Sequence, residues 1–232
     1  MFYREEMLAD ADSFSPSAGK PKPVVTAWLT AGLPIRIQSY PAATVEELCL
    51  SHDPGYVRGV LATKLSNGFG NRRPDVARSL PWTTGAMLAA SREALRSGVA
   101  CASVSGFHHA HYGSGGGFCT FNGLTVAAAA LLSESQVQRV LILDCDQHFG
   151  DGTEEILERL NLAHQVENAS FGRWFGAPRD ADAYLAELGR QVSRFGDFDL
   201  EGCRLPDRLV VRDGETRHQI NLPVTVRGMG RW

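Results

Sequence analysis

Two apolar segments separated by a helical segment constrain the fold of this chain more than any other feature. Residues 99–104 and 139–143 are apolar runs of the kind that form strands buried on both faces of a sheet. Residues 123–132 lie between them and are rich in alanine, which predicts a helix. Because parallel strands need a crossover connection, this order predicts a parallel sheet. Helical patterns at 153–160 and 181–195 continue the alternation, so the expected fold class is α/β, a mostly parallel sheet with helices on both faces.

A polar loop follows each of the two expected strands. The loop at 105–117 follows the first strand, and the loop at 144–152 follows the second. In open α/β sheets, ligands bind beyond the carboxyl ends of the strands, in the loops that follow them. The pattern therefore predicts that the functional site is built from these two loops.

Local signals predict three helices in the amino-terminal half. The capping box T-x-x-E at 44–47 and the Asp-Pro pair at 53–54 each predict the start of a short helix. A longer helix is expected to begin with Thr83 or Thr84 as its cap and to end at Gly98.

Composition limits the number of domains and the partners. A chain of 232 residues with 44% hydrophobic content and no obvious linker is expected to form a single domain, residues 1–232. The formal net charge of -3 offers no cationic stripe for a phosphate backbone, so no direct nucleic-acid partner is expected. No apolar run approaches the roughly 20 residues that span a bilayer, and the start lacks the layout of a secretory signal. We therefore expect a cytoplasmic protein without a membrane partner.

The cysteines are odd in number and form no C-x-x-C pair, which argues against a disulfide framework and against a thiolate zinc site. Most of the five are expected to be reduced and buried: Cys49, Cys101, Cys119, Cys145 and Cys203.

The first polar loop carries two adjacent histidines, His108 and His109, and leads into a glycine-rich segment at 115–117. An imidazole can take and return a proton near neutral pH, and glycines let a substrate approach the backbone closely. On the dipeptide alone, a solvated polar loop is the simpler interpretation. The other histidines are expected to be structural or loop residues: His52, His111, His164 and His218.

The second polar loop holds three carboxylates and an imidazole within eight positions. If the strand continues that far, Asp144, Asp146 and His148 project to the same side. Carboxylate and imidazole ligands together suit zinc, which binds both at about 2.0–2.2 Å. The alternative is an Asp-rich turn in which Asp151 or Thr153 caps the following helix. That alternative explains one or two of these residues, but not Asp146 and His148 as well.

Three motifs in this order and spacing resemble the central region of the histone deacetylase and acetylpolyamine amidohydrolase family. They are GFHHA from Gly106, GGFCTFN from Gly116 and LILDCDQHFGDGT from Leu141. Two flanking segments, HDPGYV from His52 and NGFGNR from Asn67, look like the amino-terminal part of the bacterial members. The resemblance implies the arginase-deacetylase fold.

The resemblance covers residues 8–200 and implies a zinc-dependent amidohydrolase. Such an enzyme removes an acetyl or related acyl group from an amine, either acetyl-lysine or an acetylated polyamine. By the resemblance, Asp146 and His148 would be two of the three ligands of one catalytic zinc ion. His109, oriented by Asp151, would be the general base and then the acid that protonates the leaving amine.

Further roles follow from the same resemblance. His108, paired with Asp144, would be the second histidine and support the charged transition state. Gly117 resembles the glycine whose carbonyl faces the substrate amide, and Phe118 resembles one wall of the narrow apolar channel. The oxygens that resemble the family's potassium site are the Asp144 side chain, the carbonyls of Asp146 and His148, and Ser170.

The resemblance stops near residue 200. The family takes its third zinc ligand from a Gly-Ala-Asp segment on a later strand, and its carbonyl-polarising tyrosine from a glycine-rich loop beyond it. Neither motif is recognisable in this sequence. Residues 198–200 resemble the start of that strand, and EGCRLP follows at 201–206. The divergent tail, 201–232, is interpreted as a frameshifted or truncated end, or as a divergent terminus that still closes the site; the sheet is expected to be incomplete at the carboxyl end.

Two other functions stay open. A catalytically inactive, truncated deacetylase-like protein would lack the third ligand and the tyrosine, and would act by binding acylated ligands or partners. An arginase-like enzyme with two manganese ions would share the fold. Its binuclear site needs Asp-x-His-x-Asp, whereas Phe149 and Gly150 follow His148 here. One metal ion is therefore expected.

Overall fold

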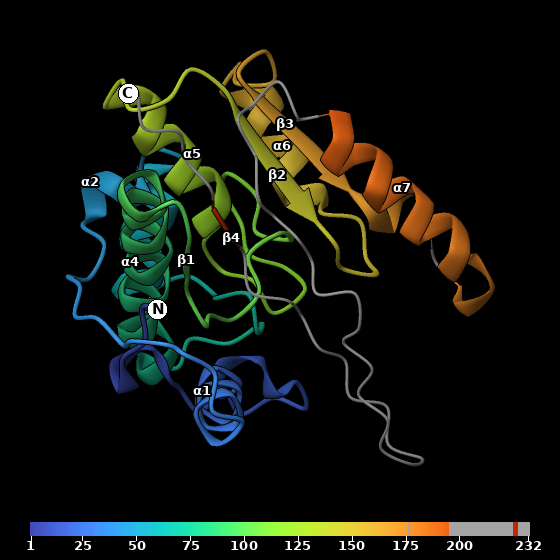
Figure 1. The fold of residues 1–232 in the computed structure, drawn as a ribbon. Helices are drawn as coiled ribbons and strands as arrows, with labels where there is room; N and C mark the ends of the chain where they lie inside the picture. Colours follow the sequence, from blue (N-terminus) through green and yellow to red (C-terminus); the bar gives the residue numbers. More distant parts are fainter. Residues whose placement is uncertain (176, 195–224, 227–232) are drawn as a thin grey trace.

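The computed structural model describes residues 1–175, 177–194 and 225–226, which form an α/β arrangement of helices around short strands (Figure 1). The helices are α1 (Pro21–Thr30), α2 (Val45–Leu48), α3 (Pro54–Leu61), α4 (Pro74–Ser97), α5 (Gly123–Ser133), α6 (Asp151–Arg159) and α7 (Ala181–Arg194). The strands are β1 (Ala100–Cys101), β2 (Val140–Asp144), β3 (Val166–Ser170) and β4 (Thr225–Val226). Short 3-10 helices are η1 (Glu5–Met7), η2 (Pro16–Ala18), η3 (Phe171–Arg173) and η4 (Pro178–Asp180). Apart from β4, the expected tail lies outside the described residues.

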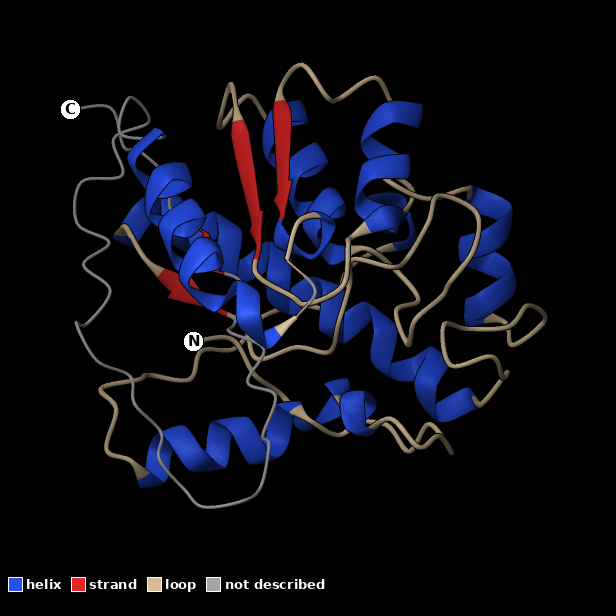
Figure 2. Ribbon diagram, turned by 90° about the vertical axis from the view of Figure 1, so that its right-hand side faces the viewer, coloured by secondary structure: helices blue, strands red, loops and turns tan. Residues whose placement is uncertain are grey.

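The longest ladder joins β2 and β3, and it is parallel, which confirms the expectation of a mostly parallel sheet. Figure 2 shows the two strands side by side, with helices on either side of them. Helix α6 lies between them in the chain as the crossover. The register pairs Val140 with Val166 and Asp144 with Ser170. Since parallel strands end at the same edge, Asp144 and Ser170 are neighbours where the functional loops begin.

The first expected strand is shorter than the sequence indicated. Only Ala100 and Cys101 form β1, which pairs antiparallel with β4, and in the described residues β2 pairs with β3 rather than with β1. Val99 is exposed, and the side chains that follow it are small, so the segment offers little area for strand contacts. The backbone N–H of Phe2 donates to the carbonyl of Cys101 at 2.9 Å, and Phe2 forms a parallel bridge with Ala102.

Strand β3 was not predicted. Its sequence, VENAS, contains no continuous apolar run, although Val166, Ala169 and Ser170 are buried. Glu167 and Asn168 interrupt the pattern, and the strand is recognisable only from its pairing with β2. Ser170, the buried polar residue at the end of this strand, is part of the site described below.

The N-cap of α4 is Arg73, ten or eleven residues before the expected cap, so the prediction of Thr83 or Thr84 as its cap is wrong. Pro74 occupies the first turn, which proline favours, and both threonines are buried inside the helix. The Thr83 hydroxyl donates to the carbonyl of Ser79 at 3.1 Å instead of capping an N-terminus. The predicted end is confirmed, because Gly98 is the C-cap with φ 84°.

The two short-helix predictions are confirmed. In the capping box, the Glu47 N–H donates to the Thr44 hydroxyl at 3.1 Å, and the Thr44 N–H donates to the Glu47 carboxylate at 2.9 Å. Asp53 caps α3 by accepting from the N–H of Tyr56 at 2.8 Å, and Pro54 follows it in the first turn. Helix α1 was not expected. The helix expected at 181–195 is α7, and residue 195, its expected end, lies outside the described residues.

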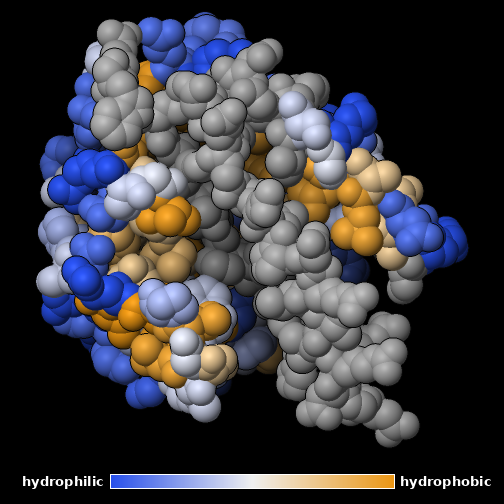
Figure 3. Space-filling model, viewed as in Figure 1, coloured by the Kyte–Doolittle hydropathy of each residue, from blue (hydrophilic) through white to orange (hydrophobic). Residues whose placement is uncertain are grey.

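The core is formed where α4 packs against α5 and the neighbouring loops. Residues 123–131 of α5 are all buried, which its small alanines permit because they let adjacent helices approach closely. Apolar side chains remain on the surface over α1 and α7 (Figure 3), including Leu29 and Leu185. Within the described ranges, no helix combines the length and the apolar character needed to cross a bilayer.

Candidate active site

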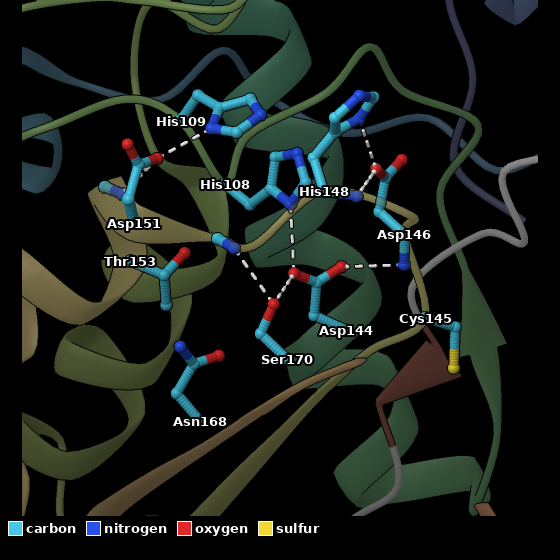
Figure 4. A network of polar contacts seen from close by, with 12 residues as sticks. His108, His109, Asp144, Cys145, Asp146, His148, Asp151, Thr153, Asn168 and Ser170 are labelled. Carbon is cyan, nitrogen blue, oxygen red and sulfur yellow. Dashed lines mark hydrogen bonds and ion pairs between the residues drawn. The ribbon is translucent and has the colours of Figure 1, made fainter. Parts of the chain in front are cut away.

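Asp144, the last residue of β2, is the hub of the site (Figure 4). Its Oδ2 accepts from Nδ1 of His108 at 2.9 Å and from the hydroxyl of Ser170 at 2.8 Å. Its Oδ1 accepts from the backbone N–H of Asp146 at 3.1 Å. The Ser170 hydroxyl in turn accepts from the N–H of Gly150 at 2.9 Å. The structure therefore brings Asp144 and Ser170, the two side chains that resemble the potassium site, into direct contact.

His109 has a carboxylate partner of its own, Asp151. Nδ1 of His109 lies 2.6 Å from Oδ1 of Asp151, and the His108 and His109 ring centroids are 4.1 Å apart. A carboxylate accepts hydrogen bonds, so Nδ1 of His109 carries its proton and Nε2 keeps a free lone pair. Asp151 is the first residue of α6, whose N-cap is Gly150, so the alternative in which Asp151 or Thr153 caps the helix is wrong.

Two turns, rather than an extended strand, bring Asp146 and His148 together. Strand β2 ends at Asp144, so the condition under which alternation would align all three side chains is not met. The chain curls because Asp144 accepts from the N–H of Asp146, and Asp146 accepts from the N–H of His148 at 2.8 Å. The His148 ring nevertheless lies beside the histidine pair, with its centroid 6.0 Å from that of His109.

The donor atoms of Asp146 and His148 fit a zinc ion. Oδ1 of Asp146 and Nδ1 of His148 are 3.0 Å apart. Two ligands at about 2.0–2.2 Å in a tetrahedral zinc site are separated by roughly 3.3–3.6 Å, so a small relaxation lets one cation contact both. Among the described residues, no group of three His, Cys, Asp or Glu side chains is arranged to hold a metal ion. The described residues thus include two of the three side chains that the resemblance implies as ligands.

Close packing of the histidine loop depends on Gly117. Its φ is +52°, and a Cβ at this position would lie 2.5 Å from Cδ2 of the His109 ring. Only glycine allows the chain to pass beneath the imidazole at this distance. Gly117, which was expected to face the substrate amide, is therefore adjacent to the expected general base.

Phe118 follows in an aromatic group that the sequence did not reveal. Its φ is +66°, and its ring contacts Phe14 edge-on at 5.1 Å and Phe69 at 5.8 Å between centroids. Phe14 is 93% exposed. The loops are interlocked because the Phe118 N–H donates to the carbonyl of Gly68 at 3.0 Å. The NGFGNR motif was the available signal for Phe69, while Phe14 lies outside every recognised motif.

His108 and Asp144 each stabilise the charged form of the other. Burial alone would raise the pKa of Asp144, but hydrogen bonds from His108, Ser170 and Asp146 outweigh burial and leave that pKa lowered. Burial alone would lower the pKa of His108, but Asp144 and the neighbouring carboxylates raise it overall. His108 and Asp144 thus favour the charged pair. The pKa of Asp151 is likewise lowered, because His109 and the N–H of Gly152 outweigh its burial.

The remaining histidines fit their expected roles where the structure describes them. His52 is completely buried: its Nδ1 donates to the carbonyl of His111 at 2.9 Å, and its Nε2 accepts from the N–H of Asn122 at 2.7 Å. Burial lowers the pKa of His52 to about 4. His111 lies in a loop, 3.7 Å from Asp151, and His164 is exposed. His218 lies outside the described residues.

The cysteines agree in part with expectation. The four described cysteines are all free, but Cys119 alone among them is fully buried. Cys49, Cys101 and Cys145 are partly exposed, and Cys203 lies outside the described residues.

Lys20 lies close enough to Asp146 to interact with its charge, which the sequence did not indicate. Burial lowers the pKa of Lys20, although the negative charge of Asp146 opposes that shift.

The fold and this cluster of histidines and carboxylates define the class of protein. A family model for the histone deacetylase domain matches residues 20–171, and the chain belongs to this family. The match includes both polar loops and ends just after Ser170.

Individual relatives extend this finding. The chain is 34% identical over 169 residues to an uncharacterized protein of Picosynechococcus, a match that covers 62% of this chain and 53% of the relative. It is 33% identical over 131 residues to the polyamine deacetylase HDAC10 of Rattus norvegicus, over 50% of this chain and 22% of that protein. The crystal structure of the HDA15 HD domain superposes with a TM-score of 0.61 at 25% identity, over 72% of this chain and 51% of that domain. The chain thus spans about half the length of the first relative and of the solved domain.

Proposed function

We propose that this chain is a zinc-dependent amidohydrolase that removes an acetyl or related acyl group from an amine. Membership of the histone deacetylase family supports the reaction class. The observation that carries the proposal is the 2.6 Å contact between His109 and Asp151, beside the ring of His148. That arrangement provides a base with a fixed tautomer next to a pair of metal donors.

In this proposal, Asp146 and His148 hold the zinc ion. When bound, zinc lowers the pKa of a water molecule and polarises the amide carbonyl of the substrate. The donor separation of 3.0 Å and the ligand chemistry of the pair support this assignment. Asp144 and Ser170, in contact at 2.8 Å, are proposed to hold a potassium ion beneath the site.

The two histidines have different proposed roles: His109 transfers the proton, and His108 stabilises charge. Because Asp151 accepts from Nδ1 of His109, Nε2 is available to take a proton from the attacking water and then deliver it to the leaving amine. His108 has a raised pKa through Asp144, so it is proposed to stay positively charged and to stabilise the negative charge that develops on the substrate oxygen.

The proposed substrate is a small acylated amine, either acetyl-lysine or an acetylpolyamine. Both place an acylated amine at the end of a flexible methylene segment. The exposed ring of Phe14 and the partly exposed ring of Phe118 offer a surface for such a chain, next to Gly117 and His109. One relative is a polyamine deacetylase, which supports the polyamine class. A single domain and a cytoplasmic location belong to the same proposal, and the free cysteines are consistent with a reducing compartment.

Zinc quantification by mass spectrometry, combined with a fluorogenic acetyl-lysine assay and an acetylpolyamine assay, tests this function. The expected result is zinc bound to the purified chain together with hydrolysis of at least one acylated amine. Stoichiometric zinc with no turnover of either substrate class would contradict the proposal and would favour an inactive, ligand-binding protein.

A further inference from the structure

Helix α7 reaches the metal-ligand turn through one side chain, Tyr184. Its hydroxyl donates to the backbone carbonyl of Cys145 at 3.0 Å. The ring packs edge-on against Phe171 at 4.9 Å and against Phe175 at 5.8 Å. Phe171 is completely buried and directly follows β3. The aromatic contacts therefore fix the direction in which the Tyr184 hydroxyl points.

The carbonyl that Tyr184 binds belongs to the peptide group that enters Asp146. The N–H of that same peptide group donates to Oδ1 of Asp144 at 3.1 Å. A peptide group is planar, so bonds at its oxygen and at its nitrogen together fix its rotation. The peptide between Cys145 and Asp146 is thus held from both sides, by α7 and by the end of β2.

The orientation of this peptide extends to both candidate zinc ligands. It sets the position of the Asp146 Cα and therefore the direction of the carboxylate. Oδ1 of that carboxylate accepts from the backbone N–H of His148 at 2.8 Å and lies 3.0 Å from the His148 ring. A rotation of the peptide before Asp146 would consequently move both donors.

We propose that Tyr184 is a positioning residue that pre-arranges Asp146 and His148 for metal binding from outside the site. The Tyr184 hydroxyl donates to the peptide that orients these two side chains. The benefit for the metal rests on the proposed function, whereas the ordering of the turn does not, because both hydrogen bonds join groups of the chain itself. The structure thereby assigns α7 a part in the site, although the sequence indicates it only as a helix of the α/β alternation.

The direct test is amide hydrogen exchange, followed by NMR, in the metal-free chain and in Tyr184→Phe. This substitution keeps the ring and its packing and removes only the hydroxyl. Exchange at Asp146 and His148 is expected to be about tenfold faster in the variant, while exchange in α4 stays the same. The matched control is Tyr56→Phe, which removes a Tyr hydroxyl that donates to a backbone carbonyl, that of Thr120, also at 3.0 Å. That control is expected to leave the Asp146 and His148 amides unchanged.

A second readout is the zinc dissociation constant, measured by competition with a chromophoric chelator. Tyr184→Phe is expected to weaken zinc binding about fivefold, while circular dichroism and the melting temperature of the metal-free chain stay close to wild type. Equal exchange at Asp146 and His148 in wild type and Tyr184→Phe would overturn the positioning role. Failure of the wild type to bind zinc contradicts the proposed function alone, since the exchange comparison needs no metal.

Discussion

Nδ1 of His109 lies 2.6 Å from Oδ1 of Asp151, although 42 residues separate them in the chain. The two loops that carry them follow different segments of the fold, and α6 begins at Asp151 itself. The nearby pair of His108 and Asp144 repeats the arrangement at 2.9 Å. Two imidazoles, each with a separate carboxylate, can therefore differ in charge and in task.

Asp151→Asn tests the contribution of this carboxylate to catalysis. An amide at position 151 can also offer its NH₂ group to the imidazole, and it does not stabilise the positive charge that His109 acquires when it takes a proton. We expect kcat to fall about 10- to 100-fold, with little change in KM. Glu158→Gln removes an exposed carboxylate from the same helix and is the matched control. Equal kcat values for the two variants would show that Asp151 does not support His109.

Gly117→Ala tests the close approach beneath His109. The new Cβ would lie 2.5 Å from the ring, and the φ of +52° is unfavourable for alanine by about 1–2 kcal/mol. Gly70→Ala is the control because its φ is +76° but no atom lies within 4 Å. We expect Gly117→Ala to lose more unfolding free energy in urea than Gly70→Ala, and to lose activity as well. A smaller loss for Gly117→Ala would mean that the imidazole moves freely away from the backbone.

The lowered pKa of His52 predicts how the free energy of unfolding depends on pH. Its pKa is near 6.5 when unfolded and is lowered to about 4 by burial in the fold. Between these values the unfolded state binds the extra proton, so the contribution of His52 is fully present above pH 6.5 and is lost as the pH falls toward 4. The limiting slope is about 1.4 kcal/mol per pH unit.

His52→Gln isolates this contribution. The variant is expected to be less stable than wild type at pH 7.5, because it loses the hydrogen bonds to His111 and Asn122. The difference between the two proteins should shrink at pH 5.5, since glutamine has no proton to gain. Urea unfolding at both pH values measures this difference, and a gap that stays constant with pH would rule out titration of a buried His52.

Phe118→Ala tests the aromatic surface. Removal of the ring that contacts Phe14 and Phe69 should raise KM for substrates with a long apolar chain about tenfold, and change kcat less. Phe14→Ala should have a weaker effect in the same direction. Val99→Ala, at an exposed apolar residue next to α4, is the control and should leave KM unchanged. An equal rise in KM for a short acylated amine would mean that this surface does not contact the chain.

Local chemistry made much of the fold and of the candidate site predictable. The capping box at Thr44, the proline after Asp53 and the glycine at position 98 act through neighbouring residues, so their effects can be recognised in sequence. The two polar loops were predictable for a related reason, because each follows an apolar run. Their contents were then interpreted by resemblance to a family, which the match over residues 20–171 supports.

Features that depend on distant contacts could not be predicted in this way. Strand β3 is defined by pairing with β2, and its own residues alternate too weakly to reveal it. Likewise, Asp146 and His148 meet through turns of the backbone rather than through strand alternation. Tyr184 is separated from Cys145 by 39 residues, and no local pattern connects the two.

The most direct test compares the zinc-loaded wild type with His109→Ala, by kcat/KM on an acetyl-lysine peptide and on an acetylpolyamine. Wild type is expected to hydrolyse at least one substrate above a buffer blank containing the same zinc, and kcat/KM of the variant is expected to be at least about 10²-fold lower. Circular dichroism should show that both proteins are folded. Equal hydrolysis by the two proteins would contradict the assignment of His109 as the group that moves the proton.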